Sequence, residues 1–333
     1  MFFITSRMPT VNTEPELNKN FVFDMGNNSS SKSFFCCQRA KKGKYEEIGS
    51  KGMLSALKKA QWRQILLYIH GFSNMPEDTF AAAEEFQALC DQKKPNEILV
   101  IPLIWPCDND LGVIKDYWDD ESAADQSAYA FARLFEAFKK WRNAPEYNPE
   151  DDPCLKRINV LAHSMGNRVL RQTLIECQHK QPKGLPLLFR NVFMAAADVL
   201  NETLHKGQPG ECICQAARNV MVYYASDDLA LRASKVANVV KAEASRRLGH
   251  TGPEDMNLTP QNVYAIDCDE VNMAYDPLKG HSYFRSGKKK GQPGLVFDHI
   301  FQTLLTGRPF PTEEYRKSSI LGLKMKKVKT AAR

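Results

Sequence analysis

The stretch that decides the fold reads INVLAHSMGNRVL, from Ile158 to Leu170. Its first half is a short run of β-branched and small apolar residues, which indicates a buried strand. After the turn, apolar residues recur at helical spacing, which indicates a helix. Ser164 lies at the junction, with Ala162 two positions before it and Gly166 two positions after it. The sequence therefore predicts a strand, a cramped turn that holds a serine, and a helix.

A serine in such a turn has the arrangement of a nucleophile elbow, in which the hydroxyl is held clear of the backbone. Bulky side chains two residues to either side would clash in so tight a turn. Gly166 meets this demand, and Ala162 replaces the usual first glycine with a residue that is still small. An ordinary strand–turn–helix unit with a helix-capping serine is the alternative interpretation.

Strand-like and helix-like segments alternate from about residue 62 to 305, which predicts an α/β fold with helices on both faces of a mostly parallel sheet. We expect about eight strands, of which the two nearest the N-terminus are antiparallel and lie at the edge of the sheet. The expected strands are 2–6, 34–38, 65–69, 98–103, 158–162, 191–195, 220–224 and 262–266, with a polar loop at 27–31, and the clearest expected helices are 124–141, 229–248 and 296–305.

No shift in composition marks a second domain. We expect residues 1–61 to supply edge strands and loops of one domain and residues 62–310 to form its core. Residues 311–333 read as a basic C-terminal tail, for which a solvated end is favoured over a contact with nucleic acid or a membrane. The interval 199–219 is short, so we expect a small or absent cap over the site.

The bulk composition narrows the class of protein. The net charge is only +6, and no nucleic-acid motif is present, so we expect no nucleic-acid partner. No apolar run is long enough to span a membrane, and no signal peptide is evident.

Nine cysteines without a regular framework indicate reduced thiols in a cytoplasmic protein. Cys212 and Cys214, near His205, fit no zinc pattern, so we expect no metal or other cofactor. The oligomeric state stays open.

A serine hydroxyl becomes a nucleophile when a base removes its proton, and a carboxylate must fix the tautomer of that base. In folds with such an elbow, the acid and then the histidine follow the serine in the chain. Asp198, Asp227 and Asp228 each follow a predicted strand and are candidates for the acid. Because an aspartate at a helix start is also a favoured cap, we rank Asp228 first, expect Asp227 to be the cap, and keep Asp198 as the reserve acid.

The same chain order selects the histidine. His179 and His205 precede the proposed acid, His250 ends a predicted helix, and His299 lies within the last helix. His281 lies in the loop KGHSYF between the last predicted strand and the last helix. Such a loop delivers a side chain over the carboxyl edge of the sheet, so we expect His281 to be the base.

Two backbone N–H groups are expected to form the oxyanion hole. One belongs to Met165, directly after the nucleophile, and the other to Phe72, after the His70–Gly71 pair that ends an early strand. His70 and His163 are expected to be structural. Trp105, Tyr117 and Trp118 could line an apolar and aromatic pocket with Phe72, although they could equally belong to the core.

The chain resembles the α/β-hydrolase superfamily over residues 62–305 and, more narrowly, a mostly bacterial family of predicted serine hydrolases. The D-x-A-L pattern of this family falls on Asp228 and its late G-H-S-Y pattern on His281, which agrees with the chain-order argument. The segments with this resemblance are 2–7 (FFITSR), 70–72 (HGF), 104–106 (IWP), 162–167 (AHSMGN), 196–198 (AAD), 224–231 (YASDDLAL) and 280–283 (GHSY).

The sequence thus predicts a serine hydrolase that cleaves a small-molecule carboxylic ester or thioester through an acyl-enzyme on Ser164, with His281 as base and Asp228 as orienting acid. An acyltransferase is the alternative within the enzyme class. A non-catalytic binding protein on the same fold is the alternative outside it, because a fold alone does not establish activity.

Overall fold

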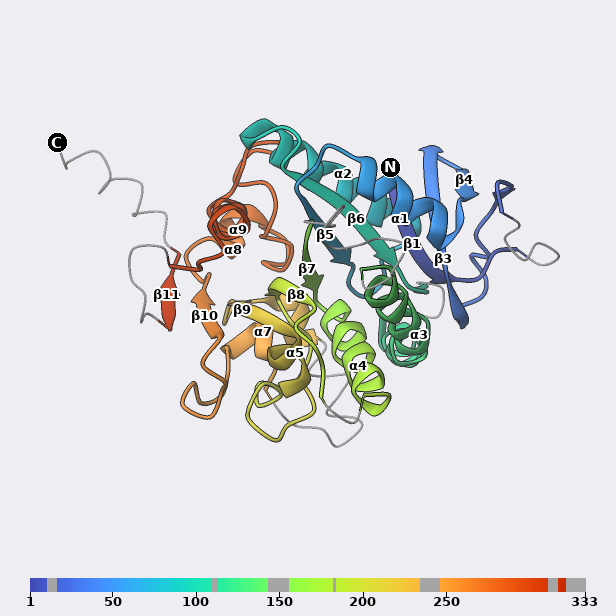
Figure 1. Ribbon diagram of the computed structural model, residues 1–333. Helices are drawn as coiled ribbons and strands as arrows, with labels where there is room; N and C mark the ends of the chain where they lie inside the picture. Colours follow the sequence, from blue (N-terminus) through green and yellow to red (C-terminus); the bar gives the residue numbers. More distant parts are fainter. Residues whose placement is uncertain are drawn as a thin grey trace.

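The computed structural model describes residues 1–10, 17–108, 113–142, 156–181, 184–233, 246–310 and 317–321, and its strands all belong to one sheet (Figure 1). The strands are β1 (Phe2–Arg7), β2 (Asn20–Phe21), β3 (Ser30–Lys41), β4 (Lys44–Glu47), β5 (Gln64–Ile69), β6 (Ile98–Ile104), β7 (Arg157–His163), β8 (Phe189–Ala195), β9 (Ala217–Tyr224), β10 (Val263–Asp267) and β11 (Ser318–Ile320). The helices are α1 (Gly49–Lys59), α2 (Pro76–Lys93), α3 (Val113–Arg142), α4 (Gly166–His179), α5 (Glu211–Ala216), α7 (Leu248–Thr251), α8 (Asn272–Tyr275) and α9 (Leu295–Thr306).

The described part of the sheet has eleven strands, in the order β11-β10-β9-β8-β7-β5-β6-β1-β3-β4-β2. Neighbours from β11 to β1 are parallel, and β3, β4 and β2 continue the sheet with antiparallel pairs. All eight sequence-predicted strands are present, so the mostly parallel α/β fold is confirmed. The expected number of about eight is too low, because β2, β4 and β11 have only two, four and three residues and show no hydrophobic period.

The N-terminal strands also differ from the expectation in position. β1 pairs with β3 as predicted, but it lies inside the sheet, because its other side pairs in parallel with β6. β3 begins at Ser30 and so takes over part of the loop expected at 27–31. Residues of the N-terminal segment therefore extend the same sheet as the core.

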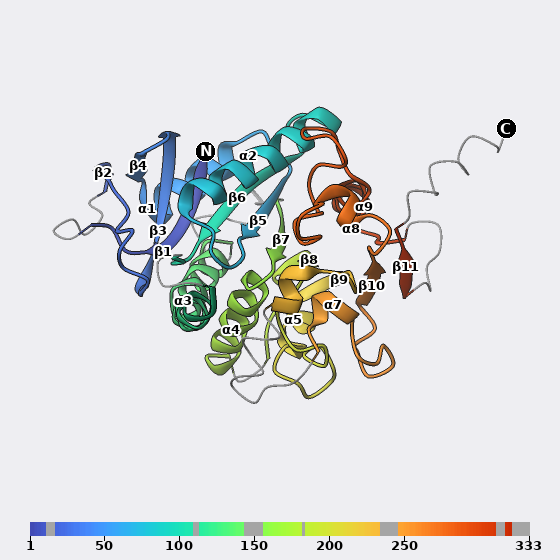
Figure 2. The ribbon, with the colours of Figure 1, turned by 180° about the vertical axis from the view of Figure 1, so that it is seen from behind.

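Helices cover both faces of the sheet (Figures 1 and 2). Alternate residues of β5 show why: Ile65, Leu67 and Ile69 belong to one buried cluster, and Leu66 and Tyr68 to another. The first cluster also includes apolar residues of α1, α3, α4 and α5, and the second those of α2 and α9. Strand β5 is therefore apolar on both sides, as expected for a strand inside a doubly covered sheet.

Two of the expected segments need correction. The helix expected at 229–248 is helical over 229–233, residues 234–245 lie outside the described part, and Leu248 begins the separate helix α7 after an extended Arg247. The expected basic tail contains β11, which pairs with β10, while 311–316 and 322–333 lie outside the described residues. The sequence pattern gave no signal for β11, because three residues are too few to show a period.

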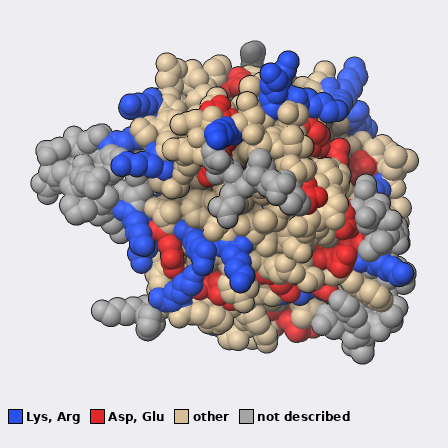
Figure 3. Space-filling model, turned by 90° about the vertical axis from the view of Figure 1, so that its right-hand side faces the viewer, with Lys and Arg blue, Asp and Glu red and all other residues tan. Residues whose placement is uncertain are grey.

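The surface charge is mixed. On the face shown in Figure 3, lysine and arginine side chains are interspersed with aspartate, glutamate and uncharged residues. None of the described helices combines the length and the apolar character that crossing a membrane requires.

We expect the buried His299 in α9 to make folding sensitive to acid. Its ring accepts from the Tyr223 hydroxyl at 2.7 Å and lies 3.0 Å from the Pro309 carbonyl oxygen, and burial lowers the pKa of His299 to about 4. An unfolded histidine has a pKa of about 6.5, so the unfolded chain binds the proton first as the pH falls. The stability from the neutral ring is therefore complete above about pH 6.5 and is lost towards pH 4.

A His299→Gln variant retains a donor and an acceptor but does not titrate. Urea unfolding at several pH values should show that the variant loses less stability than the wild type between pH 6.5 and 4, by a difference on the order of 3 kcal/mol. The carboxylates of the chain contribute equally to both proteins, so they cancel in the comparison. Equal pH dependence for the two proteins would contradict the assignment.

Candidate functional site

The elbow lies where β7 ends and α4 begins, at the carboxyl edge of the parallel strands, which is where open α/β sheets place their ligands (Figure 1). Ser164 has a φ of +53° and is 5% exposed. A residue other than glycine is uncommon in this left-handed region and costs of order 1–3 kcal/mol there. The backbone is therefore strained at the residue that the sequence selects as nucleophile.

Two glycines allow the chain after β5 to approach the elbow. A Cβ atom at Gly166 would lie 2.5 Å from the carbonyl oxygen of His70 and 2.6 Å from that of Ile69. A Cβ atom at Gly71 would lie 2.8 Å from the Cβ atom of Ser164. These contacts explain why a larger residue cannot occupy the second small position of the elbow.

His281 and Asp228 meet above the same edge of the sheet. The Nδ1 atom of His281 lies 2.6 Å from Oδ2 of Asp228, whose side chain is fully buried. The ring of His281 lies 4.7 Å from the ring of His163, the chain neighbour of Ser164. A neutral imidazole that donates from Nδ1 to a carboxylate leaves Nε2 free to accept a proton. The structure therefore brings together the predicted base and the first-ranked acid.

Asp228 also caps the helical turn that follows it. Its Oδ1 atom accepts the backbone N–H of Leu231 at 3.0 Å while Oδ2 faces His281. The prediction that Asp227 is the cap is wrong, because the Asp227 carboxylate accepts the side-chain amide of Asn272 instead. One carboxylate can cap a helix and orient a histidine because its two oxygens point to different partners.

The loop that bears His281 is fixed by Asp276, a residue that is not among those predicted from the sequence. Its Oδ2 atom accepts the backbone N–H groups of His281 and Ser282 at 3.0 and 2.9 Å. Gly280 has a φ of +62°, and a Cβ atom there would lie 2.5 Å from the sulfur of Met273. The pair Asp276–Pro277 favours a turn and is the signal that could have revealed this residue.

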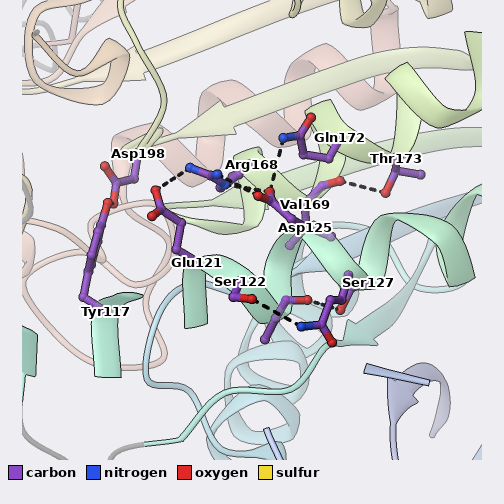
Figure 4. Close-up of polar contacts among 12 residues, drawn as sticks. Tyr117, Glu121, Ser122, Asp125, Ser127, Arg168, Val169, Gln172, Thr173 and Asp198 are labelled. Atoms are coloured by element: carbon purple, nitrogen blue, oxygen red, sulfur yellow. Dashed lines mark hydrogen bonds and ion pairs between the residues drawn. The ribbon is translucent and has the colours of Figure 1, made fainter. Parts of the chain in front are cut away.

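Asp198, the reserve acid, has other partners. Its Oδ2 atom accepts the Tyr117 hydroxyl at 3.0 Å (Figure 4). Its Oδ1 atom lies 3.3 Å from Nε of Arg247 in an ion pair that is poorly aligned for a hydrogen bond. Nearby, Asp125 and Glu121 of α3 pair with Arg168 of α4, the helix that follows the elbow. Asp198 therefore belongs to the contacts that hold α3 near the elbow.

The two other histidines of the site are buried and bind backbone atoms. Burial lowers the pKa of His70 to about 4, and its Nδ1 atom lies 2.9 Å from the carbonyl oxygen of Gly71. Burial, and next the charge of His281, holds the pKa of His163 well below its usual value. The Nε2 atom of His163 lies 3.2 Å from the carbonyl oxygen of His281. Both rings are therefore neutral near pH 7, and each donates to a carbonyl.

The predicted oxyanion donors belong to residues that adjoin the elbow. Met165 precedes the first residue of α4, and Phe72 follows Gly71, which lies against the elbow. Within the part of the chain that the structure describes, the backbone N–H groups of Phe72 and Met165 have no hydrogen-bond acceptor. Unpaired N–H groups beside a nucleophile are available to an oxyanion.

Of the predicted pocket residues, Trp105 belongs to the core, whereas Tyr117 lies against Phe72. Trp105 does not line a pocket: it is fully buried, stacks on His70 at 5.0 Å, and donates its indole N–H to the His70 carbonyl oxygen. Tyr117 contacts the ring of Phe72 at 5.7 Å, and Trp118 is half-buried. The sequence alone does not show whether a tryptophan at the end of a strand lies in the core or lines a pocket, because both environments are apolar.

Two cavities differ in their distance from the elbow. One of about 540 Å³ at the carboxyl edge is lined by His163 together with Asn74, Asp276 and Ser282. Another of about 380 Å³ is lined by Arg157, Arg190 and Arg218, near the amino ends of their strands, and so lies at the opposite edge of the sheet. The first adjoins the candidate site.

Among the described residues, no three His, Cys, Asp or Glu side chains are grouped so that they could hold a metal ion. Cys212 and Cys214 are buried free thiols, and burial raises the pKa of Cys212 to about 12. Ser164 and the His281–Asp228 pair, which the structure places at this edge of the sheet, are side chains of the kinds that serve in proton transfer and nucleophilic attack.

Comparison with known proteins gives one family. The model of the family "Alpha/beta hydrolase of unknown function (DUF900)" matches residues 47–290, which include Ser164, Asp228 and His281 but not the N-terminal segment 2–7. No curated protein matches. Among solved structures, the phospholipase PlaB from Legionella pneumophila, in complex with thio-NAD, is similar at 12% identity and a TM-score of 0.24, over 65% of this chain and 40% of that one. The chain spans less than half of that protein, and so weak a likeness has no bearing on function. The family match covers most of the sequence, and the chain therefore belongs to this family of α/β hydrolases.

Proposed function

We propose that the protein is a serine hydrolase that cleaves a small-molecule carboxylic ester or thioester through an acyl-enzyme on Ser164. The observation that supports this most is the 2.6 Å contact between His281 Nδ1 and the buried Asp228 carboxylate, above a serine held at a φ of +53°. A helix-capping serine would need neither the strain nor the histidine–carboxylate pair. The non-catalytic alternative leaves both without a purpose.

The proposed first step transfers the acyl group to the enzyme. Nε2 of His281 takes the proton of Ser164 while Oγ attacks the carbonyl carbon, and the oxyanion forms beside the N–H groups of Phe72 and Met165. The bond to the leaving oxygen or sulfur then breaks, and His281 returns the proton to that atom. A water molecule repeats the sequence in the second half and releases the carboxylic acid.

The buried thiols support a reducing compartment such as the cytoplasm as the place of this reaction. The eight described cysteines are free and buried, with no disulfide among them. Burial raises the pKa of the Cys36 thiol to about 12, which keeps it protonated and unreactive. We therefore assign nucleophilic attack to Ser164 and not to a thiol.

A fluorophosphonate probe tests the proposal. We expect it to attach to the wild-type protein at one site, which peptide mass mapping should place on Ser164, and to leave Ser164→Ala unmodified. Heat-denatured wild type is the control, because the elbow must be folded to activate the serine. A label that persists in Ser164→Ala, or that maps to another residue, would contradict the proposal. A panel of esters and thioesters of increasing acyl length, read on the same preparations, then defines the substrate class.

A further inference from the structure

The Gly71–Phe72 peptide is oriented by side chains that bind its carbonyl oxygen. This oxygen lies 2.9 Å from Nδ1 of His70 and accepts the side-chain amide of Asn74 at 3.1 Å. A peptide is planar and trans, so its N–H points opposite to its C=O. The Phe72 N–H is therefore turned away from these donors, in the segment that lies against Ser164.

The next peptide, Phe72–Ser73, is held at both of its polar groups. Its carbonyl oxygen accepts the same Asn74 amide at 2.9 Å, and its N–H donates to Oδ2 of Asp120 at 2.9 Å. Ser73 has a φ of +56°, a conformation that a serine adopts only when its surroundings impose it. The bond to Asp120 is part of what imposes it.

Asp120, on helix α3, accepts hydrogen bonds from three other segments of the chain. Its side chain is fully buried, and its Oδ1 atom accepts the amide of Asn28 at 2.9 Å and the backbone N–H of Asp108 at 3.0 Å. Burial raises the pKa of the Asp120 carboxyl, and the bond from the Ser73 N–H opposes this most. Bonds to an ionised carboxylate are about twice as strong as neutral ones. This carboxylate therefore joins the loop after β5 to two other segments.

Arg7, at the end of the N-terminal FFITSR segment, supports the peptide that donates to Asp120. Arg7 is 1% exposed and donates from Nη1 to the Cys107 carbonyl oxygen at 2.6 Å and from Nε to the Asp24 carbonyl oxygen at 3.0 Å. It thus fixes the residue next to Asp108, whose N–H binds Asp120. Strand β1 is linked in this way to the loop that bears Phe72.

We propose that Asp120 and Asn74 are positioning residues of the oxyanion hole: together they fix the peptides on both sides of Phe72 so that its N–H faces the carbonyl attacked by Ser164. This inference rests on the proposed hydrolase function and extends it to two residues outside the serine, histidine and acid. The role proposed for the two residues needs no contact with the substrate. Each acts through the orientation of one backbone donor.

Two variants separate positioning from folding. Asp120→Asn keeps the shape of the side chain but removes its charge and one acceptor, and Asn74→Ala removes the amide that binds two carbonyls. In each, we expect kcat for an activated p-nitrophenyl ester to fall about 10- to 100-fold with KM changed less than about 2-fold, because a misplaced donor weakens transition-state binding. Glu97→Gln is the matched control, since Glu97 is a carboxylate that is 4% exposed and binds Gln64 near the opposite edge of the sheet.

Fluorophosphonate labelling distinguishes the possible outcomes. The final stoichiometry of labelling gives the fraction of molecules with a folded site. The labelling rate depends on the geometry of the oxyanion hole, because the hole must receive the phosphoryl oxygen of the probe. We expect wild-type stoichiometry and a rate lowered as kcat is lowered. Wild-type kcat and rate in both folded variants, or a change confined to KM, would overturn this inference while leaving the hydrolase proposal intact. A wild type that takes no label at all would overturn the hydrolase proposal, and this inference with it.

Discussion

Alanine at Ser164 is expected to lower kcat for an activated ester by about 10⁶-fold, alanine at His281 is expected to do the same, and the double variant should lose no more than either. The reason is that the two side chains act as one unit: without the base the hydroxyl is inert, and without the hydroxyl the base has no proton to remove. Measured kcat at saturating substrate, with melting curves to establish folding, provides the test.

The matched control for this cycle is His179→Ala. The side chain of His179 is 68% exposed at the end of α4, so its removal takes away a histidine without touching the elbow. We expect wild-type kcat and stability for this variant. Losses that add up in the double variant, or a His281→Ala protein that keeps more than a hundredth of wild-type kcat, would assign the base to another group.

The parts of the fold that the sequence predicts are those with a long local pattern. Five of the six residues of β5 alternate between two cores, and α9 repeats its apolar residues at helical spacing, so both are evident from the sequence alone. β2, with its two residues, exists only because Asn20 and Phe21 pair with β4. Its presence depends on a partner strand, which local sequence does not encode.

In the candidate site, too, residues under a local constraint are predictable from the sequence and contacts between distant segments are not. Gly166 and Ser164 are recognisable because the constraint on them is local: one tight turn demands a small residue beside the serine. The bond from Ser73 to Asp120 joins residues 47 apart in sequence and depends on how α3 packs. Trp105 shows the same limit, since an apolar ring at a strand end is equally suited to a pocket and to the core.

Asp228→Asn is expected to lower kcat and Asp198→Asn to lower stability, and the two variants together decide which carboxylate is the acid. An asparagine at 228 can still accept the Leu231 N–H and cap the helix, but it cannot hold the imidazole in the tautomer that leaves Nε2 free. We expect kcat to fall by about 10⁴-fold with a change in unfolding free energy below about 1 kcal/mol.

At position 198 the loss should appear in stability. The Asp198 carboxylate neutralises Arg247, whose side chain is 6% exposed, and an amide would leave that guanidinium buried without its counter-charge. A broken buried pair costs about 3 kcal/mol, and the poor alignment of this one places it at the low end. Urea unfolding should show that loss in Asp198→Asn while kcat per folded molecule stays within about 10-fold of wild type, because Asp198 binds Tyr117 and not the histidine. If instead Asp198→Asn loses kcat and Asp228→Asn keeps it, the orienting acid follows β8, and the contact between Asp228 and His281 is structural.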